Sequence, residues 1–253
     1  MTNSFKQAIQ QGIPQIGFWL SIGDTTTAEI CACAGFDWLL IDGEHTPQTP
    51  HSILGQLRAI GCHPATHAIA RVPCADQTVI KQYLDLGVKS ILVPMVETAH
   101  QAQAIVQACR YPPMGTRGIG GARAHLWGGR SDYLNVANDE IAIIVQLETK
   151  LSLVNLEAIA AVEGIDGLLV GPADLSSSLG HLGNPAHEEV QNAIMDAIKR
   201  IQLAGKAAGI QTRDEALARR CLEQGAVMVG VGLDAQMLAA QTRLLATTFK
   251  VNP

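Results

Sequence analysis

The chain has 253 residues and a formal net charge of −5; 47% of its residues are apolar and only 4% are aromatic. No basic run is longer than the pair Arg219-Arg220, which argues against nucleic acids and membrane surfaces as partners. The sequence has no apolar stretch of the roughly 18 residues that a membrane span needs, and its first residues lack the apolar core of a signal peptide, so we predict a cytoplasmic protein.

The cysteines show no C-x-x-C spacing and no histidines at zinc-finger distances. We therefore predict that they are ordinary small side chains in a reducing compartment, and not a disulfide framework or a zinc site. They are Cys31, Cys33, Cys62, Cys74, Cys109 and Cys221.

Apolar runs alternate with amphipathic stretches from one end of the chain to the other. Short runs rich in Val, Ile, Leu and Ala are typical of strands buried on both faces of a parallel sheet. In chain order, the predicted strands are Gln15–Ser21, Asp37–Asp42, His67–Val72, Ser90–Val96, Ile141–Glu148, Gly167–Val170, Lys206–Ile210 and Val227–Val231. The predicted helices between and after them are Thr26–Ala34, Ser52–Ile60, Asp76–Leu86, Ala99–Cys109, Leu151–Ala161, Glu188–Ala204, Arg213–Gln224 and Ala235–Phe249.

Glycines follow several of these helices, where helix C-caps are expected. They are Gly35, Gly61, Gly87, Gly205 and Gly225. Eight βα-units with short connections predict a single (β/α)8 TIM-barrel domain over residues 1–253. A doubly wound open sheet is the competing fold, but it needs no eighth strand, and no G-x-G-x-x-G follows the first strand.

One connection is too long for a plain barrel. The segment from Tyr111 to Asn138 contains Pro112, Pro113 and several glycines, and loops of this length in compact domains are usually functional. It precedes a strand, so it begins on the face opposite the usual active site. We expect it either to fold over the barrel or to contact a neighbouring subunit.

Two acids stand at predicted strand ends, about one βα-unit apart. Glu148 ends the strand that begins at Ile141, and Asp174 follows the strand that begins at Gly167. Barrel active sites lie at strand C-termini, and carboxylates completed by water and substrate oxygens are typical ligands of Mg²⁺ or Mn²⁺. The pair predicts metal-assisted chemistry on a small, oxygen-rich substrate, although two salt-bridged core acids would give the same pattern.

The other strand ends supply an imidazole, a guanidinium, a further acid and several uncharged groups. These residues are Trp19, Asp42, His45, Arg71, Gln146, Ala173 and Gln211. The set suits formation of an enolate from a 2-oxo acid whose carboxylate and keto oxygens are held by the metal. Arg71 would neutralise the charge on the keto oxygen, and His45 would move the proton of an aldol hydroxyl.

Structural roles compete with these assignments. Asp42 could be a helix N-cap, Arg71 an ion-pair partner and His45 a hydrogen-bonded loop residue. The remaining histidines have no placement at a strand end and are interpreted as structural; they are His51, His63, His67, His100, His125, His181 and His187.

Five separated motifs, in order along nearly the whole chain, resemble the HpcH/HpaI aldolases, which are class II, metal-dependent pyruvate aldolases. The motifs are Gly35-Phe-Asp-Trp-Leu-Leu-Ile-Asp-Gly-Glu-His45, Leu92-Val-Pro-Met-Val96, Tyr111-Pro-Pro-Met-Gly-Thr-Arg-Gly118, Gln146-Leu-Glu-Thr149 and Val170-Gly-Pro-Ala-Asp-Leu-Ser176. The resemblance implies a TIM barrel of the phosphoenolpyruvate/pyruvate type. It also implies a hexamer, arranged as a trimer of dimers, with the glycine-rich loop near a subunit boundary.

The resemblance also implies roles for individual residues. Glu148 and Asp174 would bind Mg²⁺, Mn²⁺ or Co²⁺, while Gln146 and the backbone amides of Ala173 and Asp174 would bind the 2-oxo acid. Arg71 would stabilise the enolate and His45 would be the acid/base. Asp42 and Asp85 would raise the basicity of His45, although Asp85 ends a helix near the opposite face of the barrel.

We therefore predict an aldolase that reversibly cleaves 4-hydroxy-2-oxo acids into pyruvate, or hydroxypyruvate, and an aldehyde. No lysine stands at the sixth strand end, where a Schiff-base aldolase could place one, which favours the metal route. Gln211 stands where the family often has an aliphatic residue, which favours a polar aldehyde. The alternatives are an acyl-CoA lyase or oxaloacetate decarboxylase using the same site, and a non-catalytic 2-oxo acid binding protein.

Overall fold

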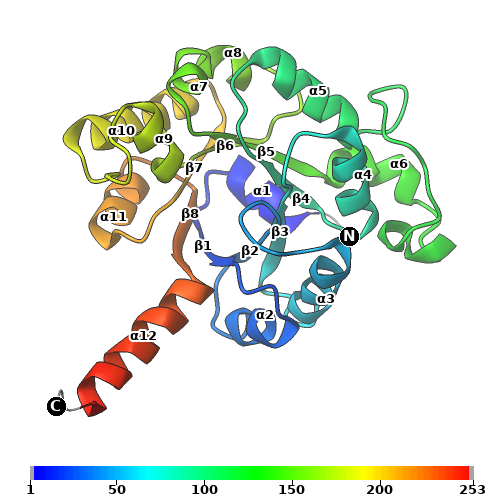
Figure 1. The fold of residues 1–253 in the computed structure, drawn as a ribbon. Helices are drawn as coiled ribbons and strands as arrows, with labels where there is room; N and C mark the ends of the chain where they lie inside the picture. Colours follow the sequence, from blue (N-terminus) through cyan, green and yellow to red (C-terminus); the bar gives the residue numbers. More distant parts are fainter. Residues whose placement is uncertain (1–2, 251–253) are drawn as a thin grey trace.

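The computed structural model describes residues 3–250, and within them eight parallel strands pair in chain order. Because β8 also pairs with β1, the sheet closes into a barrel (Figure 1). The strands are β1 Gln15–Leu20, β2 Trp38–Asp42, β3 His67–Arg71, β4 Ser90–Val93, β5 Ala142–Leu147, β6 Gly167–Val170, β7 Ala207–Gln211 and β8 Met228–Leu233. The predicted (β/α)8 barrel is confirmed.

Helices surround the barrel (Figure 1). They are α1 Ser4–Gln10, α2 Thr25–Ala32, α3 Pro50–Gly61, α4 Gln77–Asp85, α5 Ala99–Cys109, α6 Tyr133–Glu140, α7 Lys150–Val154, α8 Leu156–Ala160, α9 Pro172–Ser178, α10 Glu188–Leu203, α11 Glu215–Glu223 and α12 Asp234–Phe249. A short 3-10 helix, η1, covers Arg123–Gly128.

The strands carry apolar side chains on both faces. In β5, Val145 and Leu147 pack in the layer between the sheet and the outer helices, whereas Ile144 packs inside the barrel with Trp38 and Leu40 of β2. Successive strand residues point to opposite faces, so a strand buried on both faces reads as a continuous apolar run. This is why the strands were predictable from the sequence.

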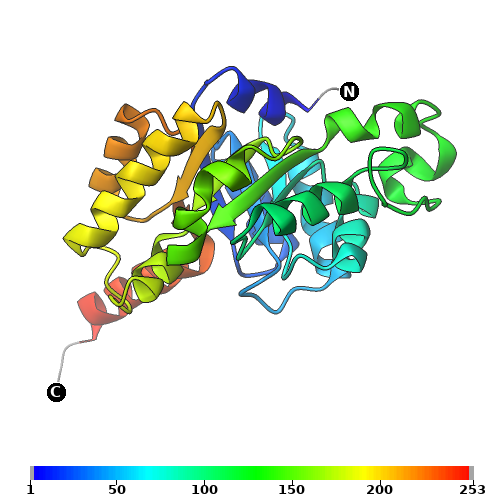
Figure 2. The ribbon, with the colours of Figure 1, turned by 90° about the horizontal axis from the view of Figure 1, so that it is seen from above.

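Helix α1, which was not predicted, closes the N-terminal end of the barrel. Its buried side chains Phe5 and Ile9 join the interior cluster, and Asn3 caps the helix by accepting the N–H of Lys6. The amide of Asn3 also donates to the carbonyl of Lys89 at 2.9 Å. In Figure 2, α1 lies at one end of the barrel and α12 lies toward the other.

Three details differ from the predicted elements. The helix expected over Leu151–Ala161 is two short helices, because Asn155 ends α7 and begins α8. Helices α6 and α9 were not predicted. Gly61 is the last residue of α3 and not its C-cap, whereas the other four predicted C-cap glycines have positive φ.

The segment from Tyr111 to Asn138 is partly helical, since η1 and the start of α6 lie within it. It is organised around Arg117, whose side chain is fully buried. The guanidinium of Arg117 lies 4.5 Å from the Tyr111 ring centroid, donates to the Tyr133 hydroxyl at 3.3 Å and pairs with Asp85 at 2.8 Å. This segment connects α5 to β5 and packs beside α4, with which Thr116 and Arg117 form hydrogen bonds.

The last helix, α12, extends away from the barrel (Figure 1). Asp234 fixes its first turn, because the carboxylate accepts the backbone N–H groups of Ser21 and Ile22 at 2.8 and 3.2 Å. Beyond that point several large apolar side chains are exposed: Met237, Leu238, Leu244, Leu245 and Phe249. Among the described residues, no helix is long and apolar enough to cross a membrane.

Candidate active site

A cavity of about 490 Å³ opens at the C-terminal ends of the strands. Its wall contains every residue predicted for the site except Glu148 and Asp85. The predicted residues that line it are Trp19, Asp42, His45, Arg71, Gln146, Ala173, Asp174 and Gln211. Eight of the predicted residues therefore lie in the wall of one cavity.

Arg71 lies at the centre of a buried ion-pair network. Asp42 and Arg71 are paired positions in the register of β2 and β3, and Asp42 accepts two hydrogen bonds from the guanidinium, at 2.9 and 2.7 Å. The remaining guanidinium nitrogen lies 2.8 Å from Glu44. Two carboxylates therefore fix the planar group, whose face also approaches the Trp19 ring at 5.7 Å.

Glu44 is a member of this site that our sequence analysis did not single out. Burial raises the pKa of its carboxyl, Arg71 opposes that shift, and the charges of Asp42 and Asp174 add to it. Its Oε2 lies 3.7 Å from Nε2 of His45, whose side chain is 65% exposed. The feature of the sequence that could have identified Glu44 is its position in Asp42-Gly-Glu-His45, immediately beyond a strand end.

Asp42 does not cap a helix, since Thr49 is the N-cap of α3. Its Oδ1 instead accepts the backbone N–H of Glu44 at 3.0 Å. This bond holds the turn that places Glu44 against Arg71 and His45 in the cavity wall. The ring of His45 is exposed, whereas Arg71 and Asp42 beside it are buried.

Glu148 is buried beneath the cavity wall. Its Oε1 accepts the backbone N–H of Met95 at 2.8 Å, and its Oε2 accepts the Gln146 amide at 2.5 Å. Met95 adopts a positive φ of 56°, a conformation uncommon for a residue with a side chain. Burial raises the pKa of Glu148 to about 7, against the lowering effect of the Met95 hydrogen bond and with the charges of Asp174 and Glu44 adding to it.

Asp174 stands in the first turn of α9, which begins at Pro172 without a side-chain cap. The preceding residue, Gly171, lies close to the buried side chains of Gln146 and Glu148. A Cβ atom at Gly171 would lie 2.7 Å from both Gln146 Nε2 and Glu148 Oε2. A larger residue would therefore occupy the space between α9 and these two side chains.

These observations fit a hard divalent cation. Glu148 and Asp174 supply carboxylate oxygens, the ligands that Mg²⁺ and Mn²⁺ prefer. Burial outweighs the lowering effects of the Met95 hydrogen bond and of Arg71 on the pKa of Glu148, so a cation bound beside this carboxylate would favour its charged form. Gln146 Oε1 is buried with no hydrogen-bond partner among the described residues, so it is free to act as an acceptor for a ligand.

Asp85 is not brought to this site. It ends α4, at the N-terminal side of the barrel, where its carboxylate pairs with Arg117 at 2.8 Å. Within one chain it does not join the residues that line the cavity. Its expected action on His45 therefore has no support from the geometry of this chain.

The outer part of the cavity contains residues that the sequence analysis did not identify. Thr212, Arg213 and Asp214 follow β7, and Pro185 and Ala186 come from the segment before α10. Loop residues of this kind carry no strand or helix periodicity, so only the folded arrangement shows that they share a wall with the strand ends.

Comparison with known sequences adds a second, independent observation. Residues 15–240 match the sequence model of a family described as HpcH/HpaI aldolase/citrate lyase. The chain belongs to this family. The match includes every strand and every residue that lines the cavity, so the resemblance seen in the separate motifs is confirmed over most of the chain.

Several known proteins are similar to this chain over nearly their whole length. A 4-hydroxy-2-oxovalerate aldolase of Rhodococcus jostii (strain RHA1) is 59% identical, covering 98% of this chain and 96% of the relative. A hydroxypyruvate/pyruvate aldolase of Deinococcus radiodurans is 56% identical, covering 99% and 91%. The crystal structure of a family protein from Burkholderia cenocepacia J2315 superposes with a TM-score of 0.94 at 39% identity, covering 98% and 99%.

Proposed function

We propose that this protein is a metal-dependent aldolase that reversibly cleaves 4-hydroxy-2-oxo acids into pyruvate, or hydroxypyruvate, and an aldehyde. The observation that carries the proposal is the position of Arg71, held by two carboxylates in the same cavity as Asp174 and Gln146. The similar proteins named as aldolases for 4-hydroxy-2-oxo acids and for hydroxypyruvate or pyruvate support it.

The 2-oxo acid binds at the inner end of the cavity. Glu148 and Asp174 hold a divalent cation (Mg²⁺, Mn²⁺ or Co²⁺), which when bound supplies Lewis-acid polarisation of the keto oxygen. The backbone amides of Ala173 and Asp174 bind the carboxylate of the substrate, because the uncapped start of α9 leaves amides available to an anion. Gln146 contacts the same 2-oxo acid from the cavity wall. Gly171 leaves the space that this arrangement needs.

Arg71 stabilises negative charge on the keto oxygen as the carbon–carbon bond breaks. Asp42 and Glu44 orient the guanidinium, so little reorganisation is needed when that charge develops. Trp19 packs beside the guanidinium and closes one side of the cavity. His45 removes the proton of the substrate 4-hydroxyl, directly or through a water molecule, and its exposure allows the proton to exchange with solvent.

The test is pyruvate release from a 4-hydroxy-2-oxo acid by protein stripped with EDTA and then resupplied with Mg²⁺, Mn²⁺ or Co²⁺. We expect activity to disappear and return with metal, and Arg71→Ala to lower kcat by about a hundredfold or more. Arg219→Ala, at an exposed arginine of α11 that does not line the cavity, is the matched control. Activity indifferent to EDTA would refute the roles of Glu148 and Asp174.

We also propose that the protein is a homo-oligomer, a hexamer built as a trimer of dimers, and that it is cytoplasmic. The exposed apolar side chains of α12, including Leu238, Leu245 and Phe249, support an interface between chains, since monomeric proteins rarely expose large contiguous apolar surfaces. Light scattering coupled to size-exclusion chromatography tests the assembly, and a monomer at micromolar concentration would contradict it.

A further inference from the structure

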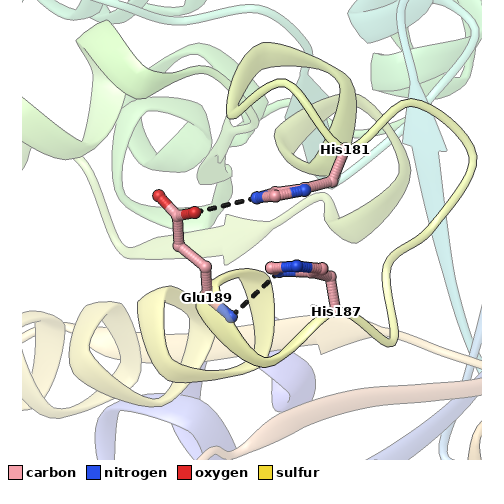
Figure 3. A group of neighbouring side chains, drawn as sticks. All are labelled: His181, His187 and Glu189. Carbon is pink, nitrogen blue, oxygen red and sulfur yellow. Dashed lines mark hydrogen bonds and ion pairs between the residues drawn. The ribbon is translucent and has the colours of Figure 1, made fainter.

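Two histidines and a glutamate meet at the start of α10, outside the catalytic cluster. The side chains of His181, His187 and Glu189 come together there (Figure 3), and one possible ligand atom from each lies within 4.8 Å of the other two. We propose that they form a second metal site, selective for a divalent transition ion such as Zn²⁺.

The three groups are already arranged close to the spacing that such an ion needs. Nε2 of His181 lies 2.8 Å from Glu189 Oε2, and the rings of His181 and His187 are stacked with centroids 3.5 Å apart. A tetrahedral zinc centre with bonds of about 2.0–2.2 Å places its ligand atoms about 3.3 Å apart. Three donors could bind one ion after two small movements. The His181–Glu189 contact would lengthen slightly, and the two near-parallel rings would rotate.

The segment that carries the histidines is held by its own backbone. The N–H of His181 donates to the Ser176 carbonyl at 2.7 Å, and the N–H of Asn184 donates to the His181 carbonyl at 2.9 Å. The N–H of His187 then donates to the Asn184 carbonyl at 3.1 Å. These successive turns hold the two imidazoles near one another without a bound ion, so less ordering is needed on binding.

The ligand atoms of His181, His187 and Glu189 favour a different ion from the one expected at the catalytic site. Two imidazoles and one carboxylate suit Zn²⁺ and its neighbours in the first transition row, whereas Glu148 and Asp174 offer only oxygen atoms. His187 currently caps α10 by accepting the N–H of Glu189 at 3.2 Å. Zinc at Nδ1 of His187 would replace this hydrogen bond, and zinc at Nε2 would require Nδ1 to carry the proton.

The site is tied to the active-site cavity by the chain between its ligands. Pro185 and Ala186 lie between the two histidines in sequence and line the outer wall of that cavity. A metal ion on His181, His187 and Glu189 would hold this wall in place at the end where the aldehyde is expected. Zinc would therefore slow hydrogen exchange of the backbone amides between residues 181 and 191.

The experiment must separate this site from the catalytic one. The background is the full-length Glu148→Gln/Asp174→Asn double variant, and Zn²⁺ itself is the probe, with bound zinc measured after equilibrium dialysis. We expect one zinc ion per chain. Adding His181→Asn or His187→Asn should lower zinc affinity at least about tenfold and abolish the slowing of hydrogen exchange.

Asparagine at position 187 keeps a good N-cap, so α10 should still begin at the same place in that variant. His100→Asn, at an exposed histidine of α5, is the control and should leave zinc binding unchanged. The proposal is overturned if the background protein binds no zinc. It is equally overturned if both histidine variants bind zinc as tightly as the background, because the ion would then be on other surface groups.

Discussion

Replacing Glu148 with glutamine should stabilise the metal-free protein in alkaline solution, although it removes a ligand from the active site. The pKa of this carboxyl lies at about 7, against 4.5 for an unperturbed glutamate, chiefly because the group is buried. Between these two values the folded protein keeps a proton that the unfolded chain releases. The free energy of unfolding therefore falls as the pH rises through this window. Above about pH 7 Glu148 is ionised in the folded protein too, and the loss of stability is complete.

The size of the effect follows from the same two values. Each tenfold difference in proton affinity corresponds to about 1.4 kcal/mol, so the charged Glu148 costs the metal-free fold about 3 kcal/mol above pH 7. Glutamine has nearly the same shape and can still accept the N–H of Met95. It carries no charge, so Glu148→Gln removes the cost and leaves most of the packing intact.

The assay is urea unfolding of wild type and Glu148→Gln in EDTA, at about pH 5 and about pH 8. We expect similar free energies of unfolding at the lower pH and a more stable variant at the higher pH. Glu29→Gln, at an exposed glutamate, should show no such difference. A stability difference between wild type and Glu148→Gln that is the same at both pH values would refute the reasoning.

Added Mn²⁺ should reverse the order at the higher pH. A ligand that binds only the folded state stabilises it by about 4.1 kcal/mol at a thousand times its Kd, which exceeds the cost of about 3 kcal/mol that the charged Glu148 imposes. Wild type should gain this stability. Glu148→Gln should gain little, because it lacks the carboxylate that would coordinate Mn²⁺ and balance its charge. If both proteins gained equally from Mn²⁺, Glu148 would not be a ligand.

Three further predictions test other parts of the structure. Gly171→Ala places a methyl carbon 2.7 Å from Glu148 Oε2 and should lower Mn²⁺ affinity at least about tenfold by calorimetry; unchanged affinity would contradict the proposed cation position. Gln211→Leu should lower kcat/KM for glyceraldehyde relative to propanal by about tenfold, and an unchanged ratio would remove the preference for polar aldehydes. Burial lowers the pKa of His67 from 6.5 to about 4, so stability is lost as the pH falls through that window. His67→Gln should unfold in urea with a smaller loss between about pH 7 and pH 4.5, and equal losses would show that other groups are responsible.

The regular parts of the fold could be predicted because their burial leaves a pattern in the sequence. Each strand is apolar on both faces, and each long outer helix repeats its apolar residues with helical periodicity. Helices α1 and α9 were missed because seven residues make too few turns to show that periodicity. The break at Asn155 was missed because the apolar pattern continues through both α7 and α8.

The outer part of the site could not be predicted in the same way. Glu44 owes its ion pair to Arg71 and its raised pKa to burial in the folded barrel, and neither follows from its neighbours in the sequence. Arg213 and Ala186 line the cavity from two separate loops, whose meeting depends on the whole barrel. Asp85 shows the converse case: family resemblance assigned it to the site, but its partner in the folded chain is Arg117.

The alternation of side chains along the strands explains why the inner site was predictable at all. In β2, Leu39 and Ile41 pack toward the helices, whereas Trp38 and Leu40 face the barrel interior, so the next inward position is Asp42. The same alternation, read from the interior cluster, places further residues inward at their strand ends: Trp19, Arg71, Gln146, Gly171 and Gln211. The apolar interior of the barrel therefore ends in a polar layer at one level, formed by the last inward residue of several strands. A shift of any strand by one residue would turn its polar group into the apolar layer beneath the helices, where a charged or amide side chain has no partner. The burial that fixes the strand register thus also fixes the geometry of the site.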